Sequence, residues 1–278
     1  MNRIDFLKEQ VLPIVLTFIV CAILLFVLLL TVLGLNHFTT TDIVIRLRWV
    51  DVLVGMTVYL KTSIDFAVYI GRLMDRFPGW IGRVAIEAGT ALGNALGTIA
   101  VLIIWSFFKE VHWLLAIMIL MAALVLFRLA EDSLEHVKPE SGKADTLFLK
   151  VVHWIEKGLK LVNGLFEPVL RYVIPKRELK TEGGRSFWSL FGLAFGIPFI
   201  LGLDDFAGYV PLFNVVNVFG FGAGVLLGHM ILNIFLYLSP TRTIALVKNS
   251  VVSFIGSIAF ILLGVWGISE AFHLLFGR

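Results

Sequence analysis

Seven long apolar stretches dominate the sequence and constrain its fold more than any other feature. Each approaches or exceeds the roughly 20 residues that a helix needs to cross the hydrocarbon core of a bilayer. Of the 278 residues, 59% are hydrophobic and 15% are charged, whereas soluble domains average about 25% charged. The mean hydropathy is +0.94. The sequence therefore predicts an all-α integral membrane protein with seven transmembrane helices, near residues 11–35, 50–70, 84–108, 111–129, 187–210, 215–238 and 251–276.

The distribution of Lys and Arg predicts the orientation of these helices. The first stretch is too long for the core of a signal peptide and lacks a small-residue cleavage site, so we expect it to be retained. With seven spans, most of the basic residues fall on one side, in the N-terminal segment, the 71–83 loop, the 130–186 loop and the 239–250 loop. Cytoplasmic loops carry such an excess. We expect a multi-pass protein of the cytoplasmic (inner) membrane, with its N-terminus in the cytoplasm and its C-terminus outside.

Several function classes lack the residues that they need. Cys21 is the only cysteine, so the chain can form neither an internal disulfide nor a site of several thiolates. The sequence contains no GxxxxGK[ST] loop and no HExxH motif, and no nucleophile–base pair is visible. The basic pI near 9.0 reflects a loop rather than a nucleic-acid surface. We therefore expect no enzyme, no ATP-driven pump, no nucleic-acid partner and no tightly bound cofactor.

A short internal repeat relates the two halves of the chain. The sequence DFAVY begins at Asp65 and DFAGY begins at Asp205, at equivalent places in two predicted spans. The next span in each half carries glycines four residues apart, which let helices approach closely. These glycines are Gly89, Gly93 and Gly97 in one half and Gly220, Gly224 and Gly228 in the other.

Spans two to four thus match spans five to seven, and a repeat of three spans must enter the membrane from opposite sides. Such an inverted repeat is typical of secondary transporters, whose substrate site lies near the midplane between the repeats. We expect an N-terminal helix and external loop in residues 1–49, the first repeat in 50–130, a cytoplasmic loop in 131–186 and the second repeat in 187–278.

The long loop contains a stretch with helical periodicity. Apolar residues recur at helical spacing, and three lysines lie off their stripe. This pattern predicts a basic amphipathic helix on the cytoplasmic leaflet, which either anchors the loop to lipid or acts as a gate or docking site. The stripe consists of Phe148, Val151, Val152, Ile155, Leu159, Val162 and Phe166.

Two aspartates inside the predicted spans are the main candidates for function. A charged side chain in the membrane costs at least about 2.5–3.5 kcal/mol, so Asp65 and Asp205 need a partner, a proton or water. The alternative is a protonated aspartate that only bonds a neighbouring helix. Lys61 lies one turn before Asp65 and is either an ion-pair partner or a residue that keeps the empty site neutral. Ser63 adds a hydroxyl to this first copy, where no helix break is evident.

Other polar residues fall near these aspartates in the repeat. Asp204 precedes Asp205 and either adds a second carboxylate or faces water. Pro198 precedes both and predicts a broken fifth helix. Asn94 and His229 follow matched glycines, and Asn233 lies one turn after His229. They are candidates for the substrate or ion site, although a histidine in an apolar helix is more often a packing residue. Glu87 and Asp51 are expected at the membrane interface.

The two aspartate motifs resemble those of the lysine-exporter superfamily of membrane transporters. TSIDFAVYIG, from Thr62 to Gly71, resembles the first-copy motif of its manganese exporters. GLDDFAGY, from Gly202 to Tyr209, resembles the Asp-Asp motif of its cadmium-resistance branch. The resemblance implies that Asp65, Asp205 and the neighbouring Asp204 hold a metal ion.

The sequence therefore predicts a secondary active transporter that exports a small cation by alternating access around paired intramembrane aspartates. A divalent metal such as manganese is the first candidate for the substrate. The expected partner of the protein is membrane lipid. Two alternatives stay open. One is an exporter of an organic substrate, such as a basic amino acid or a lipid-like molecule, and the other is a non-transporting membrane scaffold. A homodimer is also an open possibility.

Overall fold

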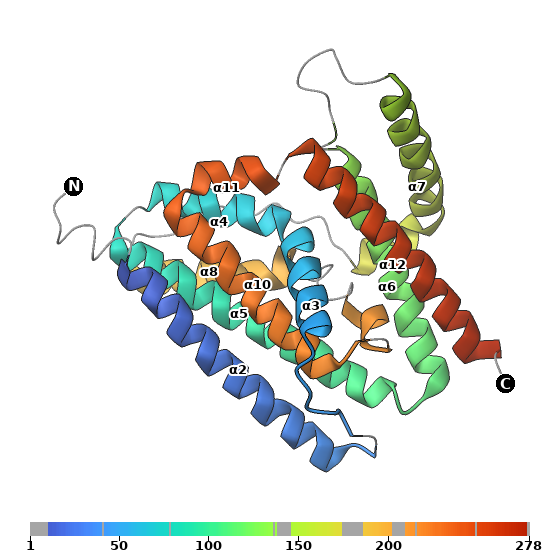
Figure 1. The fold of residues 1–278 in the computed structure, drawn as a ribbon, viewed down its shortest axis with the longest axis horizontal. Coiled ribbons are helices and arrows are strands. Elements are labelled where there is room, and N and C mark those ends of the chain that lie inside the picture. The colour runs from blue at the N-terminus through green and yellow to red at the C-terminus, as the bar shows by residue number, and fades with distance from the viewer. Residues whose placement is uncertain are drawn as a thin grey trace.

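The computed structural model describes residues 11–40, 42–77, 79–135, 137, 146–173, 186–201, 209–214, 216–247 and 249–276 (Figure 1). Only the backbone is described for residues 64–65, 146–147, 169–173, 199–201, 211, 214 and 247. Within these ranges the fold is all-helical, as predicted, with ten α-helices and one 3-10 turn, η2. The helices are α2 (Leu12–Phe38), α3 (Trp49–Thr62), α4 (Ile64–Arg76), α5 (Trp80–Phe108), α6 (His112–Glu135), α7 (Thr146–Val173), α8 (Phe187–Leu201), α10 (Val218–Leu238), α11 (Pro240–Val247) and α12 (Ser250–Phe276), with η2 at Val210–Asn214.

Five of these helices, α2, α5, α6, α10 and α12, are long and apolar enough to cross a membrane. The count rises to six if α3 and α4 form one bent span. The chain is therefore a membrane-embedded helical protein. The fifth predicted span, residues 187–210, begins as the 15-residue helix α8 and continues through residues 202–208, which lie outside the described part. Helix α6 runs to Glu135, beyond the predicted end of the first repeat.

The second predicted span is broken, which the sequence did not reveal. Helices α3 and α4 meet at Ser63 with a bend of 66°. The Tyr59 carbonyl accepts the Ser63 N–H at 2.9 Å and also the Thr62 hydroxyl at 3.2 Å. Back-bonding of this kind bends helices. The expectation of an unbroken helix in the first copy was therefore wrong, and the bend lies beside this hydroxyl bond, with no proline or glycine at residues 60–66.

Helices α3 and α10 pack with their backbones almost in contact. A Cβ on Gly55 would lie 2.1 Å from the carbonyl oxygen of Phe221, and a Cβ on Gly224 would lie 2.1 Å from that of Val52. On Gly228, a Cβ would lie 3.2 Å from the carbonyl oxygen of Met56. Small residues allow this approach between helices that have no hydrophobic force to join them in lipid. The glycines of the sixth predicted span thus serve the packing role expected of them.

The glycines of α5 have the same role toward α8. A Cβ on Gly89 would lie 2.5 Å from the carbonyl oxygen of Phe191, and one on Gly93 would lie 2.5 Å from that of Phe195. A third close pair joins α6 and α12, where the Ser257 hydroxyl donates to the Ala130 carbonyl at 2.9 Å. The described helices therefore associate mainly as three pairs, α3 with α10, α8 with α5, and α6 with α12.

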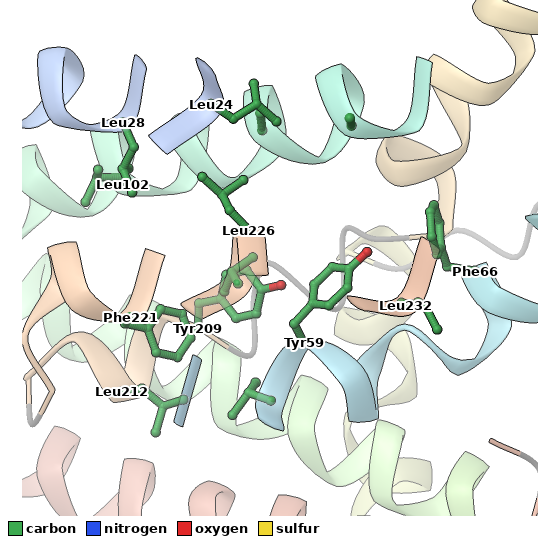
Figure 2. Packing of buried hydrophobic residues seen from close by; sticks show 14 of the residues in the cluster. Leu24, Leu28, Tyr59, Phe66, Leu102, Tyr209, Leu212, Phe221, Leu226 and Leu232 are labelled. Atoms are coloured by element: carbon green, nitrogen blue, oxygen red, sulfur yellow. The ribbon is translucent and has the colours of Figure 1, made fainter. Parts of the chain in front are cut away.

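The apolar core lies where α2, α3, α4, α5 and α10 meet. Leu24 and Leu28 of α2 and Tyr59 of α3 belong to one buried cluster with Leu102 of α5 and Leu226 of α10 (Figure 2). Helix α2 buries only this face, and apolar side chains cover its other sides. An all-apolar helix with a single packed face suits a position at the lipid boundary.

Helix α7 confirms the helix predicted in the long loop, but its environment differs from the prediction. Val152 and Leu159 are buried against α6 and α12, and the Phe148 ring lies 5.0 Å from that of Phe254. The stripe expected to face the leaflet thus packs largely on protein, because α6 and α12 offer it a continuous apolar surface. Trp154 and Leu161, on another side of α7, are each 77% exposed.

The short helix α11 was not predicted. It begins at Pro240, where the ring pre-sets the backbone of a first helical turn. Its Ile244 side chain contacts the position of Gly71 in α4. Helix α11 therefore ties the end of α10 to the second half of the bent pair (Figure 1).

Candidate functional site

A ladder of polar side chains runs along one face of α10. His229, Asn233 and Tyr237 follow one another at intervals of four residues and share this face. They are 3%, 0% and 1% exposed. Helix α10 is otherwise strongly apolar, and it lies between α2, α3 and α5. The ladder is thus enclosed by protein and does not face lipid, which would offer its polar groups no hydrogen bonds.

Both ring nitrogens of His229 are engaged. The Asn233 side-chain nitrogen lies 2.9 Å from Nε2, and the Tyr59 hydroxyl lies 2.8 Å from Nδ1. An amide nitrogen only donates, so Nε2 must accept and the ring hydrogen must sit on Nδ1. That hydrogen is donated to the Tyr59 oxygen. His229 is therefore a neutral imidazole with no free nitrogen to offer a cation in this arrangement.

Glu87 of α5 faces this ladder. Its side chain is 1% exposed, and its Oε2 atom accepts a hydrogen bond from the Tyr237 hydroxyl at 2.9 Å. The side chains of Asn233 and of Thr17, on α2, lie beside the same carboxyl group. Glu87 was expected near a membrane interface, which stays a prediction, and its side chain is enclosed among α2, α5 and α10. It is the functional candidate that sequence reasoning missed.

A pattern on α5 could have revealed Glu87. Polar residues recur on this helix at intervals of three or four, which places them on one face. All of them are at most 3% exposed. A polar stripe in a membrane helix belongs at a helix interface, because lipid offers no hydrogen bonds. The stripe consists of Glu87, Thr90, Asn94 and Thr98.

Four buried polar atoms of this region have no hydrogen-bond partner among the described residues. They are Oε1 of Glu87, Oδ1 of Asn233, Nδ2 of Asn94 and the hydroxyl of Tyr69. Native proteins leave few such atoms, because each costs about 1–3 kcal/mol. Unsatisfied polar atoms inside a polar cluster mark a place where a proton, water or ligand would bind.

The predicted aspartates are only partly within the described structure. Asp204 and Asp205 lie in residues 202–208, outside it. Asp65 is placed by its backbone in the first turn of α4, two residues after the bend, and its side chain is not described. The neighbouring Phe66 ring lies 6.0 Å from the His229 ring, which puts this turn of α4 beside the ladder. The predicted convergence of the aspartates therefore stays a prediction.

Other predicted site residues fall in different places. Asn233 and His229 are brought together, whereas Asn94 is buried on α5 with its amide nitrogen unsatisfied. Ser63 is buried at the bend between α3 and α4. Lys61 is half-buried and donates from Nζ to the Val252 carbonyl of α12. Its aliphatic chain covers Gly256, where a Cβ would lie 3.1 Å from Cδ of Lys61.

The described residues contain no group of three or more His, Cys, Asp or Glu side chains that could hold a metal ion. The side chains of Asp65, Asp204 and Asp205 are not among those described. Carboxylates with amide and hydroxyl oxygens suit hard cations such as magnesium, calcium or manganese. Comparison with known proteins gives no family: no family model, curated protein or solved structure matches this chain.

Proposed function

We propose that this chain is a secondary active transporter that exports a small cation by alternating access. A divalent metal such as manganese is the first candidate. Asp65 and Asp205 would bind it, with Asp204 beside them, and the driving force would be a proton gradient or the membrane potential. The protein would act in the cytoplasmic membrane with its N-terminus in the cytoplasm.

The observation that carries this proposal is the buried string of polar side chains between apolar helices. It contains an acid, an imidazole, an amide and two phenols, from Glu87 to Tyr59. A helical scaffold in lipid gains little from such a string, since measured interhelical hydrogen bonds average about 0.6 kcal/mol. Intramembrane ionisable residues instead mark ion pathways and proton relays.

The pairing of helices supports an inverted repeat. Helix α3 of the first half packs on α10 of the second, and α8 of the second half packs on α5 of the first. Exchanging the two halves converts one pair into the other and leaves the pair of α6 and α12 unchanged. The glycine contacts are also similar, because Gly93 approaches the Phe195 carbonyl as Gly228 approaches that of Met56, one residue away from the register of the Asp65–Asp205 match. A pseudo-two-fold axis would place the site between the halves.

An organic substrate is the second candidate, and the rings around His229 favour it. Tyr59 and Phe66 lie with their centroids 5.8 and 6.0 Å from the imidazole. Aromatic walls suit the apolar body of an organic cation, whose charge they also attract. A transporter of a basic amino acid would use the same aspartates for the charged end of its substrate.

Direct binding to the purified protein separates these candidates. Manganese, iron, cadmium, zinc and calcium ions would be titrated in turn by calorimetry, followed by lysine and arginine. We expect one divalent cation to bind, and Asp65→Asn and Asp205→Asn each to weaken binding at least tenfold. Asp132→Asn is the matched control, because Asp132 is a half-exposed acid on α6, 3.6 Å from Arg128. Binding of amino acids without metals would favour the organic substrate, and binding of neither would contradict transport.

A further inference from the structure

We infer that Glu87 and His229 hold one exchangeable proton between them, that the Asn233 amide relays it, and that this proton is the coupling ion of the transport cycle. The coupling role rests on the proposed transport function. The proton site itself rests on the hydrogen-bond geometry around Asn233. Neither Glu87 nor His229 is one of the proposed cation ligands.

In the first state, the proton resides on Glu87. Its Oε2 atom accepts from Tyr237, and a hydrogen on Oε1 makes that orphaned atom a donor. The orphaned Oδ1 of Asn233, on a side chain beside this carboxyl group, is a suitable acceptor. The amide nitrogen of Asn233 then donates to Nε2 of the neutral His229, as the 2.9 Å contact requires. One proton thus gives a hydrogen-bond partner to both Oε1 of Glu87 and Oδ1 of Asn233.

In the second state, the proton resides on His229. Glu87 transfers the hydrogen on Oε1 to Oδ1 of Asn233 and becomes a carboxylate. The amide then rotates by half a turn, and Oδ1 delivers the hydrogen to Nε2 of His229, so the ring becomes an imidazolium. After the transfer the amide nitrogen donates to the carboxylate and Oδ1 accepts from Nε2–H. Nδ1–H still donates to Tyr59. Both states satisfy their hydrogen bonds, so a single amide rotation accompanies the transfer.

The helices packed on the ladder bring titratable groups to it, and the charge of Arg83 acts on Tyr237. Helix α2 brings the thiol of Cys21, α3 brings Tyr59, α10 itself brings Tyr237, and α5 carries Arg83 one turn before Glu87. Arg83 contributes its backbone carbonyl, which accepts from Tyr237 at 3.2 Å. Helix α8 has no ionisable side chain, and α4 faces His229 with Phe66.

The conformational cycle gives this proton a use. Tyr59 lies on α3, one turn before the bend at Ser63, and Glu87 lies on α5, which packs on α8. The proton therefore moves between side chains that contact helices from both halves of the chain. A charge that appears on His229 sits beside the α4 turn that carries Asp65. An imidazolium there would repel a bound cation and favour its release.

Spectroscopy on the purified protein tests the proton site without transport. Infrared spectra at neutral pH should show a protonated carboxyl band that Glu87→Gln removes. Glu131→Gln is the matched control, because Glu131 is a buried acid on α6 that accepts from Asn163, away from the ladder. Nitrogen-15 spectra of labelled histidine should show a neutral Nδ1–H ring that His229→Gln removes. A band of equal strength in wild type and Glu87→Gln would overturn the proposal.

Flux in proteoliposomes tests the coupling role, with manganese as the first probe and the other cations as alternatives. Wild type should show net flux stimulated by a pH gradient, together with cation exchange at equal pH. Glu87→Gln should keep exchange and lose the stimulation, and Glu131→Gln should keep both. Asn233→Leu removes the relay and should also lose the stimulation, which provides a second variant if Glu87→Gln does not fold.

The outcomes separate the two proposals. Unchanged stimulation in both Glu87→Gln and Asn233→Leu would overturn the coupling role and leave the transport function standing. Absence of flux in wild type for every probe would overturn the transport function and the coupling role with it. The infrared and nitrogen spectra would still decide whether Glu87 and His229 share a proton.

Discussion

At Gly224, two helix backbones approach so closely that a single methyl group cannot be placed between them. A Cβ would lie 2.1 Å from the Val52 carbonyl oxygen and 2.9 Å from the Met56 nitrogen. These are backbone atoms of a regular helix and cannot turn away. Gly224→Ala should therefore force α3 and α10 apart and destabilise the fold by at least about 1–3 kcal/mol, the usual cost of overpacking.

Gly34→Ala is the matched control for this substitution. Among the described residues, nothing lies within 4 Å of the Cβ position at Gly34, in the last turns of α2. Alanine favours a helix by up to about 1 kcal/mol over glycine, so this variant should be as stable as wild type or more so. Thermal unfolding of both variants in detergent would measure the difference. Equal stability would mean that α3 and α10 do not touch at Gly224.

The residues of the candidate site were only partly predictable. His229 and Asn233 were singled out because they are polar residues in an apolar helix, and the structure joins them at 2.9 Å. Glu87 was expected near the interface because it lies close to the start of the span predicted at 84–108. Distance from the end of a span does not say which face of the helix a side chain occupies, and the contacts of Glu87 with α2 and α10 were therefore not predicted.

At the scale of elements, most of the long helices were predictable from the sequence. The bend within a span and the helices that pack on each other were not. The long apolar run of α2 dictates a helix, because backbone groups in lipid must bond within their own segment. The bend at Ser63 depends on how Thr62 bonds the Tyr59 carbonyl, which hydropathy does not report. The stripe of α7 was predicted from its spacing, but spacing alone cannot distinguish a lipid surface from the faces of α6 and α12.

The turn between α5 and α6 is tied to the end of α2 by a pH-dependent contact. Glu110 accepts from the Thr40 backbone N–H at 2.8 Å and from its hydroxyl at 3.0 Å. These two bonds hold the pKa of Glu110 below its ordinary value. Because the folded pKa is depressed, the contact stabilises this corner fully above the ordinary pKa and is lost as the pH falls through the depressed one.

Hydrogen exchange measures this contact at the Thr40 amide. Protection, normalised to the intrinsic rate at each pH, should decline on acidification through the titration of Glu110. Glu110→Gln keeps an acceptor that does not titrate, so its protection should be weaker and independent of pH. A flat profile in the wild-type protein would show that Glu110 does not hold Thr40.

At the scale of the whole molecule, the two halves of the chain are interleaved rather than side by side. The largest contacts between the two halves join α3 with α10, α5 with α8, and α6 with α12. The sequence repeat indicated that two halves exist, but a match of five residues carries no information on which helices pair. The choice of partner depends on the glycines at the interfaces, because they allow two helix backbones to approach closely.

We propose that this chain moves a cation, with Asp65 of the first half and Asp205 of the second as its binding acids. Manganese flux into proteoliposomes tests it most directly, with Asp65→Asn and Asp205→Asn measured beside wild type at equal reconstitution. The account predicts saturable flux in wild type and none in either variant. Flux that persists in both variants, or its absence in wild type for manganese and every other cation tried, would contradict it.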